Sequence, residues 1–251
     1  MPVTRNVAWD GRLESFKGRD TTQYVRTAAA TAKACAACGG PLGSDEPLSL
    51  LVNITQSTAP DGTERLIFTD CVCHRRCSGP ALTVEQTPWQ PDELSPVAAR
   101  LLLTHKSKPG QASVVPALAY TLVPVVSFRE NDGELTSALV ALLLSHGFQL
   151  AMSPEYADIL EQAHETAPSC NFTVTPQGAI LLSIDGQILY REQLDPDHTD
   201  DAQWLEAAAR RRHILIISGD NLDITDTSLD LHSAAGQGTL VIGTVPVADT
   251  S

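Results

Sequence analysis

The 251-residue sequence lacks a long uninterrupted hydrophobic run, and this absence argues against a membrane-spanning helix. Its longest apolar stretch covers residues 113–126 and is interrupted by Pro116 and Pro124. The N-terminal segment carries charges throughout and lacks the apolar core of a secretory signal. We therefore expect a cytoplasmic protein without a membrane partner.

Basic residues are scarce in the second half of the chain. Residues 1–110 contain 12 Lys and Arg against 11 Asp and Glu, whereas residues 111–251 contain 5 against 19. Because an acidic surface repels phosphates, the C-terminal half is a poor candidate for nucleic-acid binding. Nucleic acid remains a candidate partner only for the N-terminal half.

Several motifs of known chemistry are also missing. Residues 234–238 read AAGQG without the Lys-Ser or Lys-Thr of a phosphate-binding loop. The aspartate-rich run 218–230 lacks the glycine and the final glutamate of an EF-hand. His74 is followed by Arg75 and Arg76, and not by the glutamate of the zinc deaminases. These absences leave the sequence without a convincing catalytic motif.

The pattern of the chain indicates an α+β or irregular α/β fold, in which helices flank a mixed sheet. Alternating apolar patterns, caps and turn residues predict its elements. The expected helices cover residues 20–34, 131–146, 154–165 and 199–212, and the expected strands cover 48–55, 64–72, 121–130, 148–152, 213–218 and 238–247. Further strands are expected between residues 172 and 194, with Asp185-Gly186 as a hairpin turn.

The same pattern suggests three segments. Residues 1–34 form an N-terminal arm and helix, 35–110 a zinc-binding module with a hairpin and linker, and 111–251 an acidic α+β domain. The Pro-rich passage 87–96 and the break at 106–111 support the boundary near residue 110. The zinc-binding hairpin is expected on the N-terminal side of this boundary.

Five of the six cysteines lie in two short clusters, CAACGG at 35–40 and CVCHRRC at 71–77. In a reducing compartment, such spacing indicates metal ligands before it indicates disulfides. A Cys-x2-Cys turn supplies two thiolates, and His74-x2-Cys77 repeats its spacing. We expect Cys35, Cys38, His74 and Cys77 to bind one structural zinc ion per chain.

Cys73-x3-Cys77 is the rival to the second pair of ligands. If the strand alternation continues to residue 74, Cys71 and Cys73 lie on the face opposite His74 and are core thiols or neighbours of the site. The absence of any metal, with the cysteines as reduced core residues, is the remaining alternative.

These motifs resemble the zinc-ribbon, LIM-type and treble-clef modules, in which such pairs hold a structural zinc. The resemblance covers residues 35–77 only. Gly79-Pro80 follows the last ligand where a treble clef has a helix, and the spacer of about 35 residues exceeds that of LIM modules. Such modules bind DNA, RNA or proteins, so the resemblance implies zinc and leaves the partner open.

Other candidate residues have simpler explanations. The run DPDHTDD at 195–201 offers Asp195, Asp197 and His198, but acids at the start of a helix and arginines at its end complement the helix dipole. Cys170 beside His164 is a candidate nucleophile, although a single cysteine is more often a packed residue.

The leading hypothesis is an interaction protein that contains zinc and binds another protein. The first alternative is an enzyme with its active site in residues 111–251. The second is nucleic-acid binding through Arg65, Arg75, Arg76 and the N-terminal arm.

Overall fold

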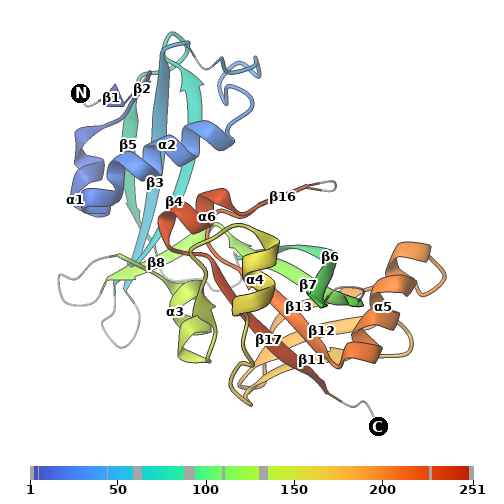
Figure 1. Ribbon diagram of the computed structural model, residues 1–251. Coiled ribbons are helices and arrows are strands. Elements are labelled where there is room, and N and C mark those ends of the chain that lie inside the picture. The colour runs from blue at the N-terminus through green and yellow to red at the C-terminus, as the bar shows by residue number, and fades with distance from the viewer. Residues whose placement is uncertain are drawn as a thin grey trace. The chain divides into compact units, whose positions relative to one another are not determined.

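The computed structural model describes residues 3–4, 6–43, 45–58, 64–87, 94–108, 111–129, 135–225 and 228–248. The chain forms two compact units (Figure 1). Unit 1 consists of residues 1–94 and 124–138, and unit 2 of residues 95–123 and 139–251. Each contains a mixed sheet with few helices, which agrees with the α+β expectation in its coarse form.

Unit 1 contains a sheet in the order β1-β2-β3-β4-β8-β9. Strands β2 and β5 both pair in parallel with β3, β2 at its start and β5 farther along. The strands of unit 1 are β1 Val3–Thr4, β2 Val7–Ala8, β3 Leu48–Thr58, β4 Glu64–His74, β5 Ala81–Gln86, β8 Val125–Arg129 and β9 Thr136–Ser137. Its helical segments are η1 Gly11–Leu13, α1 Glu14–Lys17, η2 Gly18–Asp20 and α2 Thr21–Thr31.

The two long strands β3 and β4 position the cysteine clusters. They pair antiparallel along their whole length, from Leu48 opposite His74 to Thr58 opposite Glu64. The connection between them, residues 59–63, lies outside the described residues. Because the pairing runs unbroken to His74, the CVCHRRC segment begins within a regular strand and leaves it at a defined residue.

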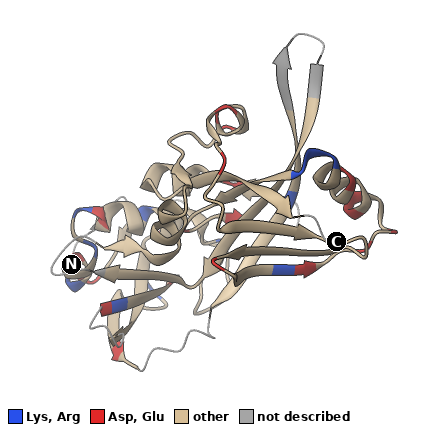
Figure 2. Ribbon diagram, turned by 90° about the horizontal axis from the view of Figure 1, so that it is seen from below, with Lys and Arg blue, Asp and Glu red and all other residues tan. Residues whose placement is uncertain are grey.

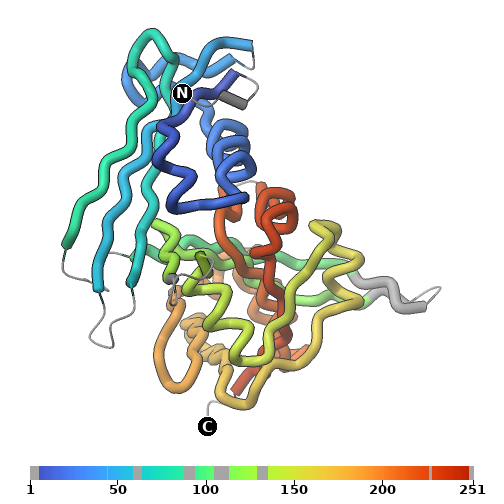
Figure 3. The backbone as a smooth tube through the Cα atoms, turned by 90° about the vertical axis from the view of Figure 1, so that its left-hand side faces the viewer, coloured from blue at the N-terminus to red at the C-terminus, as the bar shows by residue number. Residues whose placement is uncertain are grey.

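Helix α2 packs on this sheet and completes the core of unit 1 (Figure 3). The alanine-rich sequence favours the helix, whose Val25 and Ala28 are buried. They join a cluster that includes Leu50, Val52 and Ile54, alternate residues of β3. The core of unit 1 is therefore apolar and separate from the cysteine side chains.

Unit 2 contains a sheet in the order β13-β12-β11-β17-β14-β7-β6, with β10 paired to β17. Its strands are β6 Ser95–Lys108, β7 Gln111–Val123, β10 Gln149–Leu150, β11 Cys170–Val174, β12 Ala179–Ile184, β13 Gln187–Gln193, β14 His213–Ser218 and β17 Val241–Ala248, with β15 Asp223–Ile224 and β16 Leu229–Asp230 as a separate pair. Its helices are α3 Ala138–Ser145, α4 Tyr156–Gln162, α5 Thr199–Arg211 and α6 His232–Gln237.

The two faces of this sheet carry separate apolar clusters. Ile214 and Ile216 of β14 pack in one cluster with side chains of α3 and α5. Leu215 and Ile217, the alternate residues, pack in the other with side chains of α4 and α6. Burial on both faces explains why this strand is hydrophobic throughout.

The structure corrects the helix expected at 131–146. Residues 130–134 lie outside the described part, and α3 begins only at Ala138, because Thr136 and Ser137 form β9 against β8. One side of this helix faces solvent, since Leu142 and Leu144 are 37% and 38% exposed. Strands β5 and β6 and helix α6 were not expected from the sequence.

The two units differ in extent from the three segments suggested by the sequence. Residue 110 lies outside the described residues, between β6 and β7, which pair antiparallel. The Pro-rich passage at 88–93 is likewise outside them. The segment from β6 to β7 belongs to unit 2, whereas residues 124–138 return to unit 1.

Candidate metal centre

The first cysteine cluster forms a tight turn at residues 35–40. The N–H of Cys35 donates to the carbonyl of Gly40 at 2.8 Å, and the N–H of Gly39 donates to the carbonyl of Cys35 at 2.8 Å. Gly39 has a φ of 70°, a conformation that side-chain-bearing residues rarely adopt. Glycine after Cys38 therefore allows the turn to close with both thiols available.

The second cluster forms a similar turn at the end of β4. The N–H groups of Cys77 and Ser78 both donate to the carbonyl of His74, at 2.8 and 3.2 Å. The N–H of Ala36 donates to the carbonyl of Val72 at 3.0 Å. This bond fixes the first turn to β4, so two segments far apart in the sequence face each other.

The structure brings Cys35, Cys38, His74 and Cys77 together. One potential ligand atom from each lies within 4.8 Å of the others. His74 Nδ1 is 3.5 Å from Cys38 Sγ and 3.8 Å from Cys77 Sγ. Ligand atoms bound to a tetrahedral zinc are separated by about 3.8 Å. The four residues thus match the donor types and spacing of a metal site, and Cys35 and His74 are buried while Cys38 and Cys77 are exposed.

Local hydrogen bonds favour the thiolate form of Cys35. Burial raises its pKa, but backbone N–H groups of His74, Cys38 and Ala37 lower it, and the net result is a pKa of about 6. The N–H of His74 lies 3.4 Å from the sulfur. Because the thiolate is the form that binds metals, the lowered pKa favours metal binding by Cys35 near neutral pH.

The pKa values of Cys77 and His74 are also shifted, because several thiols lie close together. Desolvation, followed by the hydrogen bonds and charges of Cys38 and Cys35, raises the pKa of Cys77. The hydrogen bond with Cys38 raises the pKa of His74, although burial opposes it. Like charges this close do not all form unless a cation compensates them. Protons and a metal ion therefore compete for these atoms.

The far side of the His74 ring is held by Glu46 and Pro41. Nε2 lies 3.0 Å from Glu46 Oε2 and 3.1 Å from the carbonyl oxygen of Pro41. The hydrogen bond to the Pro41 carbonyl places a hydrogen on Nε2 and leaves the Nδ1 lone pair directed at the sulfur atoms, while Glu46 Oε2 lies close to Nε2 as a charged neighbour and has no hydrogen-bond partner among the described residues. Histidine ligands of metal ions are commonly oriented by such acceptors.

Glu46 is a site residue that the sequence reasoning missed. It lies far from His74 in the sequence, and no motif relates the two. The available signal was the strand pairing, because Leu48 lies opposite His74 and Glu46 precedes Leu48 by two residues. Only a correct register places the carboxylate beside the ring.

Cys73 and Cys71 lie outside the group of four. Cys73 is buried and Cys71 is half-buried. Burial raises the pKa of the Cys73 thiol, with a further increase from its hydrogen bond to Cys35. Cys73 is therefore a close neighbour of the candidate site, as the strand alternation suggested for a residue adjacent to His74.

The acidic run before α5 has structural contacts. The N–H of Asp197 donates to Asp195 Oδ1 at 3.0 Å, and the N–H of Asp195 donates to Asp201 Oδ2 at 2.9 Å. Asp201 also pairs with Arg100 at 2.6 Å, and this guanidinium lowers its pKa. His198 is the exposed residue preceding the helix. These contacts form the turn and the start of α5.

Cys170 is fully buried in β11, and its sulfur lies 3.7 Å from the carbonyl oxygen of His146. Burial raises the pKa of this thiol, which opposes a nucleophilic role. Within the described residues, no hydrogen bond joins it to the side chain of His164.

The three arginines considered for nucleic-acid binding have different surroundings. Arg75 and Arg76 are exposed at the turn between His74 and Cys77. Arg65 is half-buried in β4. Only the first two form an accessible pair beside the candidate metal site.

No protein-family model, curated protein or solved structure matches the chain. Among the described residues, no helix is both long and apolar enough to cross a membrane. The cysteine and histidine cluster therefore carries the functional argument.

Proposed function

We propose that Cys35, Cys38, His74 and Cys77 bind one structural zinc ion per chain, and that the protein acts in the cytoplasm by binding another protein. The observation that carries the proposal is the convergence of four donor atoms within 4.8 Å. Residues 35–77 then form a zinc module on the β3–β4 pair, similar in its ligand pattern to zinc ribbons.

The chemistry of the donor set favours zinc. Three thiolates and an imidazole suit a borderline-soft ion that accepts tetrahedral geometry, whereas calcium and magnesium prefer oxygen ligands. Four protein ligands fill the tetrahedral shell and leave no position for a water or a substrate. The proposed role is therefore structural, in which the ion joins the turn at 35–40 to the end of β4.

The exposed tip of the module is the proposed contact surface for a partner protein. Ala36 and Ala37 lie at the tip of the first turn, and Arg75 and Arg76 at the tip of the second. A metal ion bound beneath both turns fixes their backbones in advance. Little further conformational entropy is then lost when a partner binds these side chains. Two adjacent guanidinium groups suit an acidic segment of a partner protein.

Cobalt substitution tests the structural role. Co²⁺ bound by three thiolates and an imidazole is expected to give strong charge-transfer and tetrahedral ligand-field absorption. Azide or cyanide added to a closed site should leave this spectrum unchanged. A spectrum that shifts on adding either anion would show an open coordination position and overturn the structural assignment.

Charge reversal tests the interaction surface. In quantitative affinity enrichment from the native host, the double variant Arg75→Glu and Arg76→Glu should lose the partners retained by the wild type while keeping its zinc. Unchanged enrichment would reject the tip as the contact surface. Nucleic acid is the second candidate partner for the same arginines, and salt-dependent retention on DNA or RNA at low ionic strength would favour it.

A further inference from the structure

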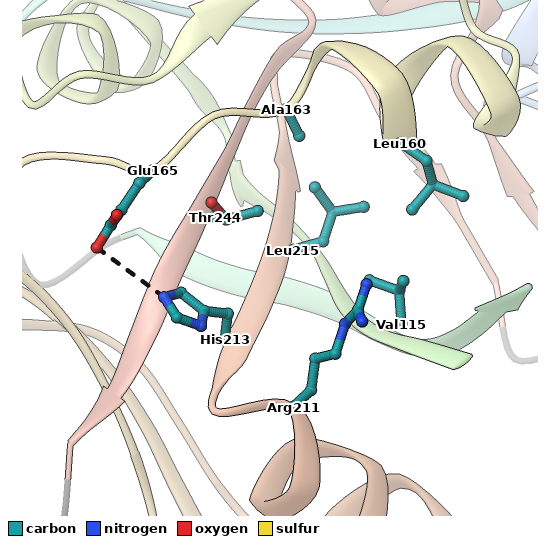
Figure 4. A pocket seen from close by; sticks show the side chains of 8 residues that line it. All are labelled: Val115, Leu160, Ala163, Glu165, Arg211, His213, Leu215 and Thr244. Carbon is teal, nitrogen blue, oxygen red and sulfur yellow. Dashed lines mark ion pairs between the residues drawn. The ribbon is translucent and has the colours of Figure 1, made fainter. Parts of the chain in front are cut away.

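Unit 2 contains a pocket of about 430 Å³ on the face of its sheet covered by α4 and α6 (Figure 4). Its lining comes from β7, β14, β17, α4 with the residues after it, and the end of α5. The volume falls in the range of small-molecule sites. The pocket opens to solvent beside His213 and Glu165, whose side chains are 46% and 69% exposed.

The floor and one wall of the pocket are aliphatic. Val115 of β7 and Leu215 of β14 form the floor, and both are buried residues of the apolar cluster on this face. Leu160 of α4 and Ala163, just after it, form the wall. Figure 4 shows Leu160, Ala163 and Leu215 around one side of the hollow. Such a surface binds a hydrocarbon chain by removing it from water.

Arg211 supplies a positive charge to the pocket, and Figure 4 shows its guanidinium beside Val115. Arg211 is the last residue of α5, where three arginines follow one another at the helix end (Figure 2). Arg210 pairs with Glu206 at 3.7 Å, but Arg211 has no ion-pair partner among the described residues. Three consecutive arginines are unusual in residues 111–251, which contain 5 Lys and Arg against 19 Asp and Glu.

The other charged residues of the rim set the orientation of a ligand. Glu165 lies 3.9 Å from His213 across the mouth and carries a negative charge. A ligand with an anionic head is therefore repelled from this end and attracted by Arg211. The planar guanidinium matches a carboxylate, with two parallel hydrogen bonds.

We propose that this pocket binds a small aliphatic carboxylate, with its head at Arg211 and its hydrocarbon chain against Leu160, Ala163 and Leu215. The described lining contains no Phe, Tyr or Trp on which a nucleobase can stack. It also contains one arginine, which is few for a polyphosphate. The inference does not depend on the zinc site.

Isothermal titration of the full chain with sodium octanoate tests the proposal. Octanoate should bind, and affinity should rise roughly threefold for each methylene from butanoate to octanoate, because each is removed from water. Octylamine should bind at least about tenfold more weakly, since it presents a positive head to Arg211. Absence of octanoate binding at millimolar concentration, or equal affinity for octylamine, overturns the proposal.

Two variants on the same helix end separate specific binding from a general attraction to the arginines. Arg211→Gln should weaken octanoate binding by about tenfold or more, because a charge-assisted hydrogen bond is lost. Arg210→Gln is the matched control, since its side chain pairs with Glu206, and it should bind as the wild type does. Equal loss in both variants, or no loss in Arg211→Gln, overturns the assignment.

Ala163→Asp tests the wall independently of the arginine. Ala163 is half-buried and follows α4, so the substitution adds a negative charge beside the hydrocarbon chain without changing the sheet. Octanoate binding should be abolished while the thermal unfolding midpoint stays near that of the wild type. Undiminished binding in a folded variant overturns the placement of the chain.

Discussion

At the scale of single residues, the candidate zinc site depends on the orientation of one ring. His74 is buried with Nδ1 toward the sulfur atoms of Cys38 and Cys77 and Nε2 toward Glu46 and Pro41. A histidine ligand needs its lone pair at the nitrogen that faces the metal, and the Pro41 carbonyl with the nearby Glu46 carboxylate favours that tautomer. Glu46 is therefore expected to contribute to zinc affinity without touching the ion.

Glu46→Ala should lower zinc affinity by about tenfold, because Pro41 remains as an acceptor but the carboxylate is lost. The measurement is competition with a chromophoric zinc chelator. Asp45→Ala is the matched control, since it removes an adjacent and exposed carboxylate. If both variants bind zinc as tightly as the wild type, the contact between Glu46 and His74 does not support the metal.

The sequence could predict the four clustered residues because their spacing is local. Cys35 and Cys38 share one turn and His74 and Cys77 another, so short-range geometry brings each pair together. Glu46 could not be predicted in this way. Its position depends on the register of β3 against β4, which the sequence pattern does not specify to the residue.

At the scale of elements, a histidine directly after α3 links the end of the helix to a hairpin turn. His146 Nδ1 lies 2.8 Å from the carbonyl oxygen of Leu142 in the last turn, and Nε2 lies 2.8 Å from Asp185 Oδ2. The bond to the Leu142 carbonyl and the carboxylate of Asp185 raise the pKa of His146. A protonated ring can donate to both acceptors and stabilises the helix end.

The stability contribution of His146 should depend on pH. Because the folded-state pKa is raised, the stabilisation is fully present below the unfolded value of about 6.5 and is lost as pH rises through the folded-state pKa. In urea unfolding, His146→Gln should be less stable than the wild type at about pH 5.5, with a smaller difference at about pH 9. Asp185→Asn should show a weaker form of the same trend. A difference independent of pH would assign the loss to packing.

Several elements followed the local pattern and others did not. Helix α5 has acids in its first turn and Arg210 and Arg211 in its last, as its sequence indicated. The turn between β12 and β13 has Asp185 and Gly186 at positive φ, which a two-residue hairpin requires. By contrast, the apolar run in β6 is a strand because it pairs with β7, and such a run alone does not distinguish strand from helix.

At the scale of the whole molecule, the chain divides its stabilising contacts between two units, each with its own apolar clusters. Long-range pairing creates this division, since β7 lies parallel to β14, with Leu215 opposite Ala117. Sequence patterns could indicate the mixture of helices and strands, but not which distant strands are neighbours. The segments suggested by composition therefore differ from the compact units.

Removal of zinc should have a local effect. The core of unit 1 is built by β3, β4 and α2, and the cysteine side chains of the candidate site do not belong to it. Chelation should raise hydrogen exchange in the turns at 35–40 and 75–78, while β14 and β17 of unit 2 remain protected. Loss of protection in β14 and β17 would mean that the metal supports the folding of the whole chain.

Zinc K-edge X-ray absorption of the purified protein tests most directly whether three sulfur atoms and one nitrogen atom bind a zinc ion. The expected first shell contains three sulfur atoms at about 2.3 Å and one imidazole nitrogen at about 2.0 Å. Four sulfur atoms would show that Cys73 replaces His74, and protein purified without zinc that fails to take it up would contradict the central claim.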